Sequence, residues 1–174
     1  MLHLERVTDV AHPLYACAMR LYQNSFPAYE LRKAASQAEI LGNLAYHFDL
    51  IYDDDVFVGE VLYWEIGEML YIEHFCILPE MRNRQYGQKV LALLQKQTLL
   101  LEIDPPVDEI SLRRKGFYER CGLVENAYPH VHPPYHRENA GHPLVVMSSP
   151  KLLTRQEYDA FRQYLNDVIM KNVY

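Results

Sequence analysis

Glycine, cysteine and long apolar runs are all scarce in this chain of 174 residues. Only seven glycines are present, which argues against an architecture of repeated tight β turns. The three cysteines make an odd number at no framework spacing, which favours a reduced, intracellular protein over a disulfide scaffold. The opening residues 1–6 lack the basic start and apolar run of a signal peptide. The longest apolar runs, such as residues 98–101, fall far short of a membrane span of about 20 residues, so we expect a cytoplasmic protein without a membrane partner.

Positive charge is also in short supply. Seventeen Lys and Arg against 23 Asp and Glu give a formal net charge of −6, which disfavours binding to nucleic acid. Hydrophobic residues make up 49% of the chain and charged residues 23%, which excludes a disordered or collagenous chain. No repeat or Gly/Ser linker divides the sequence, so we expect a single domain spanning residues 1–174.

The spacing of apolar residues predicts alternating strands and helices. Period-2 or continuous apolar patterns predict strands, and i, i+3, i+4 patterns with capping or stop signals predict helices. The predicted strands are 2–7, 46–52, 56–64, 70–78, 99–103, 124–127 and 144–147, and the predicted helices start near 13, 36, 86, 108 and 154. A meander followed by β-α-β-α implies an α/β (α+β) fold whose mixed, mostly antiparallel sheet of about six or seven strands carries helices on both faces. The His-, Pro- and Tyr-rich residues 126–143 are interpreted as a substrate-side loop or hairpin.

The segment 75–88 is the most informative part of the sequence. A strand stops at Pro79, a turn carries Arg82 and Arg84, and a helix starts directly afterwards. The first N–H groups of a helix have no internal partner and attract phosphate, and a preceding turn can add more of them. Gly87 would let such a ligand approach the backbone. A solvated helix start is the plain alternative for this segment on its own.

Residues 82–87, Arg-Asn-Arg-Gln-Tyr-Gly, resemble the acetyl-CoA signature of the GNAT acyltransferases, Arg/Gln-x-x-Gly-x-Gly/Ala after a strand that ends in hydrophobic-x-Pro-Glu. Gln85 departs from the signature, because the family usually has its first glycine there. Residues 116–123 resemble the family's Phe-Tyr-x-x-x-Gly-Phe segment, and residues 101–103 resemble a Leu-Glu-Val strand. The resemblance covers roughly residues 45–149.

The resemblance implies the GNAT fold and transfer of an acetyl group from acetyl-CoA to a primary amine, by direct attack in a ternary complex. It also implies that the pantetheine arm lies along the strand before Pro79 and that the pyrophosphate lies on the following turn. Acetyl-CoA is then the acyl donor, and no metal is expected. The residues that the resemblance assigns to acetyl-CoA are Phe75, Cys76, Ile77, Arg82, Asn83, Arg84, Gln85, Tyr86, Gly87 and Gln88.

The same resemblance suggests catalytic residues. Tyr118 is the candidate acid for the departing thiolate, with a packing role as its alternative. Glu102 interrupts an apolar strand, so we expect partial desolvation to raise its pKa towards neutrality, and we favour it narrowly as the base. Glu73 is the second candidate base. We expect it to share a strand face with Phe75, and we expect His74 to lie on the opposite face. A water relay, or an amine of low pKa that needs no base, are further alternatives.

Other residues leave alternatives open. His130, His132 and His136 invite a metal-dependent hydrolase hypothesis, but the prolines between them favour a loop over the acceptor, where they would contact an amine. Phe26, Tyr29 and Tyr63 are placed in the acceptor cleft by analogy with the family. A non-catalytic acyl-CoA-binding or interaction module is the alternative function, motivated by Gln85. The last helix covers the sheet or forms a homodimer contact, and the acceptor stays open among small amines, aminoglycosides, protein N-termini and lysines.

Overall fold

The computed structural model describes residues 1–174 and has one continuous sheet of eight strands. The strands are β1 Leu2–Arg6, β2 Tyr46–Asp53, β3 Val56–Ile66, β4 Met69–Ile77, β5 Thr98–Ile103, β6 Val124–Glu125, β7 His130–His132 and β8 His142–Ser149. They lie in the order β1-β2-β3-β4-β5-β8-β6, with β7 paired to β8. Only β4 and β5 run parallel, so the predicted mixed, mostly antiparallel sheet is confirmed, with one strand more than expected.

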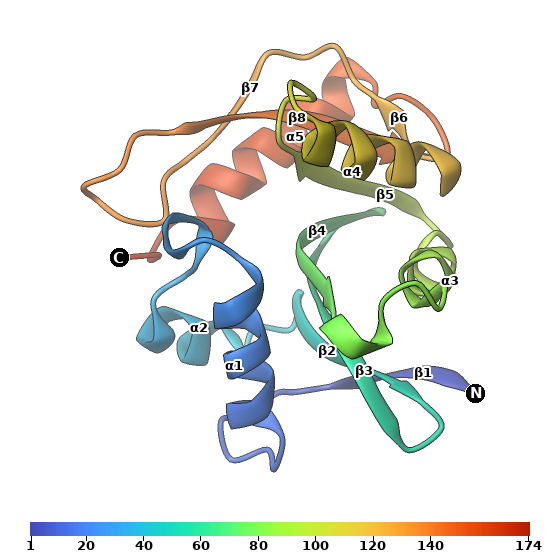
Figure 1. Ribbon diagram of the computed structural model, residues 1–174. Coiled ribbons are helices and arrows are strands. Elements are labelled where there is room, and N and C mark those ends of the chain that lie inside the picture. The colour runs from blue at the N-terminus through green and yellow to red at the C-terminus, as the bar shows by residue number, and fades with distance from the viewer.

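Helices cover both faces of this sheet (Figure 1). They are α1 Tyr15–Ser25, α2 Ala34–Ile40, α3 Tyr86–Leu94, α4 Glu109–Arg120 and α5 Arg155–Tyr164, with 3-10 turns at Ala28–Glu30 and Pro79–Met81 and a π turn at Leu165–Ile169. α1 and α2 lie on one side of the β2–β4 meander and α3 on the other. None of the helices combines the length and the apolar composition needed to cross a bilayer.

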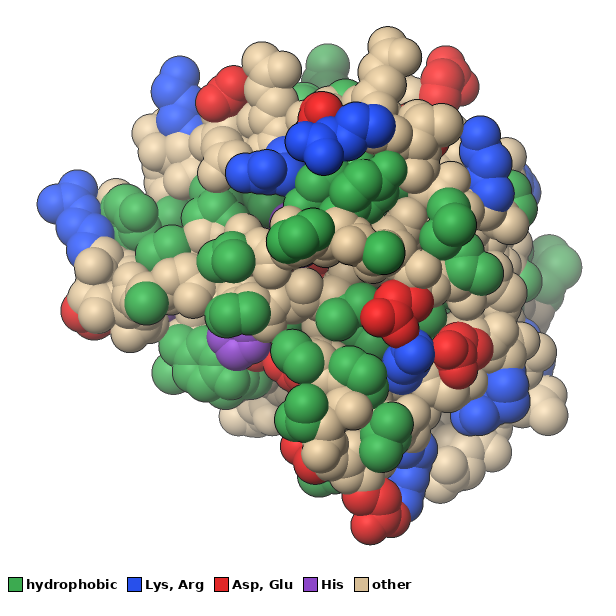
Figure 2. Space-filling model, turned by 90° about the horizontal axis from the view of Figure 1, so that it is seen from above, with side chains coloured by type: hydrophobic (Ala, Val, Ile, Leu, Met, Phe, Trp, Pro, Cys, Tyr) green, Lys and Arg blue, Asp and Glu red, His purple; other side chains and the backbone are tan.

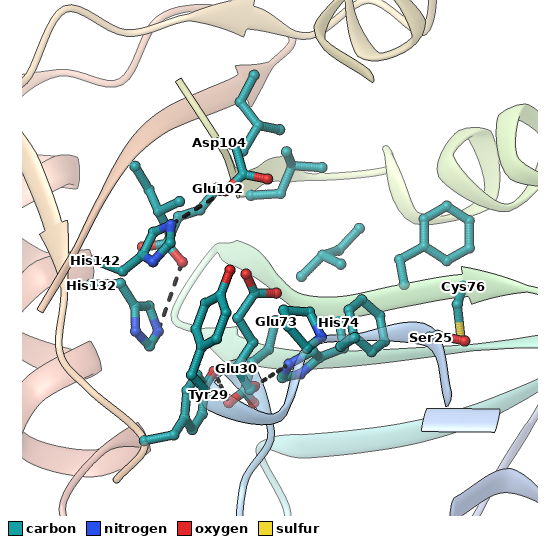
Figure 3. Close-up of a pocket in the computed structure, with 18 of the residues that line it drawn as sticks. Ser25, Tyr29, Glu30, Glu73, His74, Cys76, Glu102, Asp104, His132 and His142 are labelled. Carbon is teal, nitrogen blue, oxygen red and sulfur yellow. Dashed lines mark hydrogen bonds and ion pairs between the residues drawn. The ribbon is translucent and has the colours of Figure 1, made fainter. Parts of the chain in front are cut away.

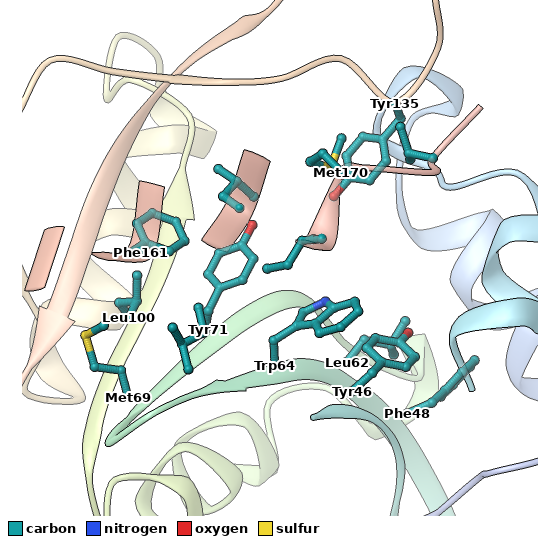
Figure 4. Close-up of a cluster of buried hydrophobic side chains, with 14 of the residues drawn as sticks. Tyr46, Phe48, Leu62, Trp64, Met69, Tyr71, Leu100, Tyr135, Phe161 and Met170 are labelled. Atoms are coloured by element: carbon teal, nitrogen blue, oxygen red, sulfur yellow. The ribbon is translucent and has the colours of Figure 1, made fainter. Parts of the chain in front are cut away.

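Two hydrophobic clusters fill the space between sheet and helices. The larger one joins α1 and α5 to one face of the sheet around Trp64, Tyr71 and Phe161, and Figure 4 shows these side chains converging. The second joins α3 to the other face through Val90, Leu91 and neighbouring strand residues. β5 is buried on both faces, as its apolar run predicts, because its side chains alternate between the two clusters.

Capping explains where two helices begin. Asp108 and Ser111 form a reciprocal capping box at α4, and Thr154 and Glu157 form the predicted one at α5. The helix predicted to start near residue 36 begins two residues earlier, at Ala34, and the Ser36 hydroxyl does not cap it but donates to the carbonyl of Asn172, 3.0 Å away.

The segment 126–143 forms the predicted hairpin rather than an open loop. β7 pairs with the start of β8, from His130 opposite Leu144 to His132 opposite His142. On the surface over α4 and this hairpin, charged side chains of both signs lie among hydrophobic ones (Figure 2).

A bulge in β4 changes which residues share a face. Between Leu62 and Tyr63 the β3–β4 register skips one residue of β4, because Leu62 pairs with His74 and Tyr63 with Ile72. Glu73 is therefore the extra residue, and it lies with His74 towards α1 and α5 rather than with Phe75. The expectation that Glu73 and His74 occupy opposite faces is wrong for this reason.

Candidate active site

β4 and β5 form a fork in the middle of the sheet. Their pairing runs from Met69–Thr98 to Ile72–Leu101 and then ends, although β4 continues to Ile77. A cavity of about 600 Å³ occupies the fork, lined by both strands, the segment after α1, α4 and the β7–β8 hairpin (Figure 3). One edge of the last five residues of β4 therefore has no strand partner and can hydrogen-bond an extended ligand.

The turn after β4 presents a row of unpaired amides. Backbone hydrogen bonding stops at the N–H of Arg82, which donates to Pro79, and resumes at the N–H of Lys89, which donates to Gln85. The amides of residues 83–88 between them make no hydrogen bond within the chain. They border a second cavity of about 350 Å³ at the start of α3. Such a group of N–H donors with the positive end of a helix dipole suits a phosphate or diphosphate.

The backbone of this turn explains the departure from the family signature. Gln85 has φ of +65° and Asn83 has φ of +62°, both in the left-handed region that glycine adopts without strain. A glycine would fit position 85 without strain, whereas Gln85 adopts this backbone at some conformational cost. Close packing is a second reason for glycine at position 87. A Cβ there would lie 3.1 Å from Cζ of Phe117, because α3 and α4 pack closely at this point.

The predicted acetyl-CoA residues lie along one path. Phe75 and Cys76 line the fork cavity, Ile77 and Arg82 line both cavities, and the second cavity is lined by Asn83, Gln85, Tyr86, Gly87 and Gln88. The fork and the amide turn are therefore continuous. Arg84 is exposed and lines neither cavity.

Tyr118 reaches the fork cavity from α4. Its ring packs against Phe117 at a centroid distance of 5.2 Å, and its hydroxyl makes no hydrogen bond within the chain. Burial raises the pKa of Tyr118 to about 12, so the phenol keeps its proton near neutral pH.

Glu73 is fully engaged by three donors. Arg32 Nη2 lies 3.0 Å and Tyr135 Oη 2.8 Å from Oε1, and Trp64 Nε1 lies 2.7 Å from Oε2. Burial opposes the charge, but the guanidinium of Arg32, His74 and these hydrogen bonds outweigh it and lower the pKa of Glu73 to about 2. A carboxylate held in this way is a weak base and a strong anchor.

Glu102 is engaged as well. Its Oε2 accepts from the hydroxyl of Tyr71 at 2.6 Å, and its Oε1 bonds Nε2 of His130. Burial alone would raise the pKa of Glu102, but His132, the His130 hydrogen bond and Tyr71 together lower it. The expected shift towards neutrality is therefore wrong, because the sequence does not show these partners.

The sequence matches the family model described as the acetyltransferase (GNAT) family over residues 11–123, more than half of the chain. The chain belongs to the GNAT acetyltransferase family.

Solved structures agree with this assignment. A protein from Bacteroides thetaiotaomicron described as belonging to the GNAT family superposes with a TM-score of 0.90 at 29% identity, covering 97% of this chain and 98% of that one. An aminoglycoside 6'-N-acetyltransferase complexed with coenzyme A gives a TM-score of 0.59 at 17% identity, covering 84% and 96%. The ribosomal-protein-S18-alanine N-acetyltransferase of Escherichia coli gives 0.56 at 15% identity, covering 88% and 96%. Both of these likenesses show the fold alone. No curated protein matches the chain.

His130, His132 and His136 of this GNAT chain have different partners. His130 links Glu102 to the hydroxyl of Tyr158, 3.0 Å from its Nδ1. His136 bonds the carbonyl of Ala28, 3.1 Å away and outside the fork cavity. His132 lines the cavity and stacks on Tyr135. The metal-dependent hydrolase hypothesis requires these three side chains to converge on one point, and they do not.

The wall of the fork cavity opposite the amide turn is acidic. Glu30, Asp104 and His142 each offer a ligand atom within 4.8 Å of the others, the one grouping within reach of a common cation. Asp104 is already paired with Arg114 at 2.9 Å and with His142 at 3.3 Å. Figure 3 shows these side chains on the far side of the cavity from Cys76.

Of the residues predicted for the acceptor cleft, Phe26 and Tyr29 line the cavity, and Tyr29 stacks on His142 at 5.6 Å. Tyr63 does not: it lies in the cluster on the α3 side and donates to Asp49, so its placement by analogy is wrong.

Sequence reasoning missed several participants. Arg32 holds Glu73 from 41 positions away, and Trp64 holds it from the neighbouring strand β3, where the bulge in β4 brings the two together. Glu60 lies fully buried opposite Cys76 in the β3–β4 register, 3.7 Å from its thiol. Burial raises the pKa of Glu60 to about 8, and a lone carboxylate within an apolar strand was the available signal.

Proposed function

We propose that this GNAT chain is an N-acetyltransferase that moves the acetyl group of acetyl-CoA to a primary amine of a small molecule or protein, by direct attack in a ternary complex. The observation that carries the proposal is the continuous path from the unpaired amides of 83–88, past Ile77 and Arg82, to the unpaired edge of β4 in front of Tyr118. A phosphate cradle leading to an open strand edge and an unbonded phenol matches the demands of a diphosphate-linked thioester.

The residues present fit acetyl-CoA. The amides of 83–88 would hold the diphosphate, with Arg82 beside them, and the edge of Glu73–Ile77 would hold the pantetheine arm. When bound, the coenzyme supplies an activated acyl group on sulfur.

Tyr118 is proposed as the proton donor to that sulfur. Its hydroxyl has no competing partner in the chain, and its raised pKa keeps the proton in place until negative charge develops beside it. The burial that raises the pKa of Tyr118 also raises the basicity of a thiolate that forms beside it, so proton transfer remains feasible.

Glu73 and Glu102 are proposed in supporting roles. Both carboxylates already accept hydrogen bonds at both oxygens and have lowered pKa values, so neither is suited to take a proton from an amine. Glu73 holds Arg32 and Tyr135 in place, and Glu102 holds His130.

The test combines binding and turnover. Acetyl-CoA at about 100 times its Kd should stabilise the protein by about 2.7 kcal/mol. This corresponds to a rise in Tm of roughly 5–10 °C for a chain of this size. Release of free CoA should then be measured with each of five acceptors: spermidine, kanamycin, phenethylamine, a peptide with an N-terminal alanine, and lysine.

A matched pair of variants separates catalysis from binding. Tyr118→Phe should lower turnover about 100-fold or more while the acetyl-CoA melting shift persists. Tyr164→Phe, which removes an equally unbonded hydroxyl from α5, should change neither. Absence of a melting shift would refute the proposal.

The alternative of a non-catalytic acyl-CoA-binding module predicts a melting shift without CoA release from any acceptor. Its motivation was Gln85, but Gln85 adopts the left-handed backbone that the signature glycine would provide. We therefore place catalysis first.

A further inference from the structure

His132 stands out among the cavity residues because one of its ring nitrogens is both buried and unbonded. The side chain is 6% exposed, and it lines the fork cavity. Its Nδ1 lies 2.6 Å from the carbonyl oxygen of Pro133, whereas its Nε2 has no hydrogen-bond partner. A buried polar atom without a partner is costly, so its retention in a cavity wall points to a ligand.

The Pro133 carbonyl fixes the tautomer of this ring. A carbonyl oxygen only accepts hydrogen bonds, so Nδ1 must carry the hydrogen. In the neutral imidazole, Nε2 then carries the lone pair. Of His130, His132 and His136, only His132 lines the cavity.

Glu102 is placed to stabilise a charged His132. Its Oε2 lies 3.8 Å from Nε2, and Tyr71 and His130 hold the carboxylate in position. Burial of an imidazolium is unfavourable unless a negative charge compensates it, and Glu102 provides that charge. The other titratable groups facing His132 are Glu30 from the segment after α1, His74 from β4 and Tyr135, on which the ring stacks.

We infer that His132 is the general base of the proposed acetyl transfer, with Glu102 as the residue that positions it and stabilises its charged form. The inference rests on the proposed function. The Nε2 lone pair takes a proton from the ammonium group of the acceptor, which leaves a neutral amine and an imidazolium. The amine lone pair then forms the bond to the acyl carbon as the bond from that carbon to sulfur breaks. The electron pair of the broken bond stays on sulfur, which takes the Tyr118 proton. The nitrogen of the new amide gives up its extra proton to solvent and the Tyr118 phenolate takes one proton from solvent. The imidazolium then releases its own proton to solvent, so that one proton is released per turnover.

The first test needs no acceptor. Long-range ¹H–¹⁵N spectra of histidine-labelled protein at pH 8 should show the signals of one imidazole ring with hydrogen on Nδ1 and none on Nε2. The signals of this ring should be absent in His132→Gln. His132→Asn serves the same assignment if the first variant does not fold. A hydrogen on Nε2 of His132 would overturn the inference while leaving acetyl-CoA binding, and hence the proposed function, untouched.

The second test uses the pH profile of kcat/KM with the panel acceptor that gives the fastest CoA release. In the wild type the rate should level off well below the pKa of the amine, because the enzyme itself deprotonates the bound ammonium group. In His132→Gln it should be at least about 100-fold lower at pH 7. It should then continue to rise tenfold per pH unit towards the pKa of the amine, because only the free amine reacts.

A matched control is available in the same hairpin region. His136→Gln removes an imidazole that bonds Ala28 outside the cavity, and it should keep the wild-type profile. The acetyl-CoA melting shift should survive in both variants. A His132→Gln profile that is merely scaled down, with an unchanged shape, would assign His132 a structural role and refute the inference. Absence of turnover with every acceptor would instead count against the proposed function.

Discussion

The buried pair of Glu73 and Arg32 offers a quantitative check of the electrostatics in this site. Both side chains are 2% exposed, and the guanidinium and carboxylate lie 3.0 Å apart. Glu73→Gln keeps the shape of the side chain but leaves the charge of Arg32 buried without its partner. Breaking a buried pair in this way typically destabilises a protein by about 3–5 kcal/mol.

The pKa of Glu73 gives a second route to the same magnitude. A decrease from the ordinary 4.5 to about 2 corresponds to about 3 kcal/mol of stabilisation. Because the folded-state pKa is depressed, this contribution is complete above the unfolded-state value and is lost as the pH falls through the folded-state value. At pH 3 about 2 kcal/mol of it should be gone.

Urea unfolding of both proteins at pH 7 and pH 3 tests this reasoning. The free energy of unfolding of Glu73→Gln should be about 3 kcal/mol below wild type at pH 7, and this gap should narrow by about 2 kcal/mol at pH 3. Glu68→Gln, in the exposed turn between β3 and β4, should lie within about 0.5 kcal/mol of wild type at pH 7. An equal gap for Glu73→Gln at both pH values would show that Glu73 does not carry a depressed pKa.

Three further changes have defined outcomes. Gln85→Gly should change the free energy of unfolding by less than about 1 kcal/mol, because the relief of backbone strain at positive φ is offset by a more flexible unfolded chain. Gln85→Val should lower the free energy of unfolding, measured by thermal unfolding, by more than about 1 kcal/mol. Gly87→Ala should weaken acetyl-CoA binding measured by calorimetry, because its Cβ meets Phe117, and Phe117→Leu in the same chain should recover part of the loss. The raised pKa of Glu60, about 8 against an ordinary 4.5, makes wild type lose stability as the pH rises between these values, by up to about 5 kcal/mol. In urea unfolding, the free energy of unfolding of Glu60→Gln should therefore rise relative to that of wild type between pH 5 and pH 9. A difference that stays constant over this range would contradict the raised pKa of a buried carboxyl without a cationic partner.

Local patterns were sufficient to predict most of the fold. The strands at 46–52, 56–64 and 99–103 were predicted to within two residues at each end, because alternation and turn residues act over short distances. The amide turn could also be predicted, since a strand, a turn and a helix start are consecutive in the chain. The helix predicted to start near 86 does begin there, and it ends at Leu94, shortly before β5 begins at Thr98 and pairs with β4.

The catalytic interior could not be predicted in the same way. The pKa of Glu102 depends on Tyr71 and on His130, which lies 28 positions along the chain, and these partners meet only when the hairpin docks on β5. Burial alone predicts a raised pKa, and the hydrogen bonds reverse its sign. The unbonded Nε2 of His132 depends on the same docking and has no local signature.

The bulge in β4 links these features into one chain of contacts. It turns Glu73 towards Arg32 and Trp64, and the same carboxylate accepts from Tyr135, whose ring stacks on His132 at 5.1 Å. Glu73 is therefore linked to His132 through Tyr135 without touching it. In Glu73→Gln the Nε2 resonance of His132 should shift, because Tyr135 loses its charged acceptor. Glu68→Gln should leave that resonance in place. An unmoved resonance in both variants would mean that Tyr135 holds His132 by packing alone, and that the bulge serves stability but not the base.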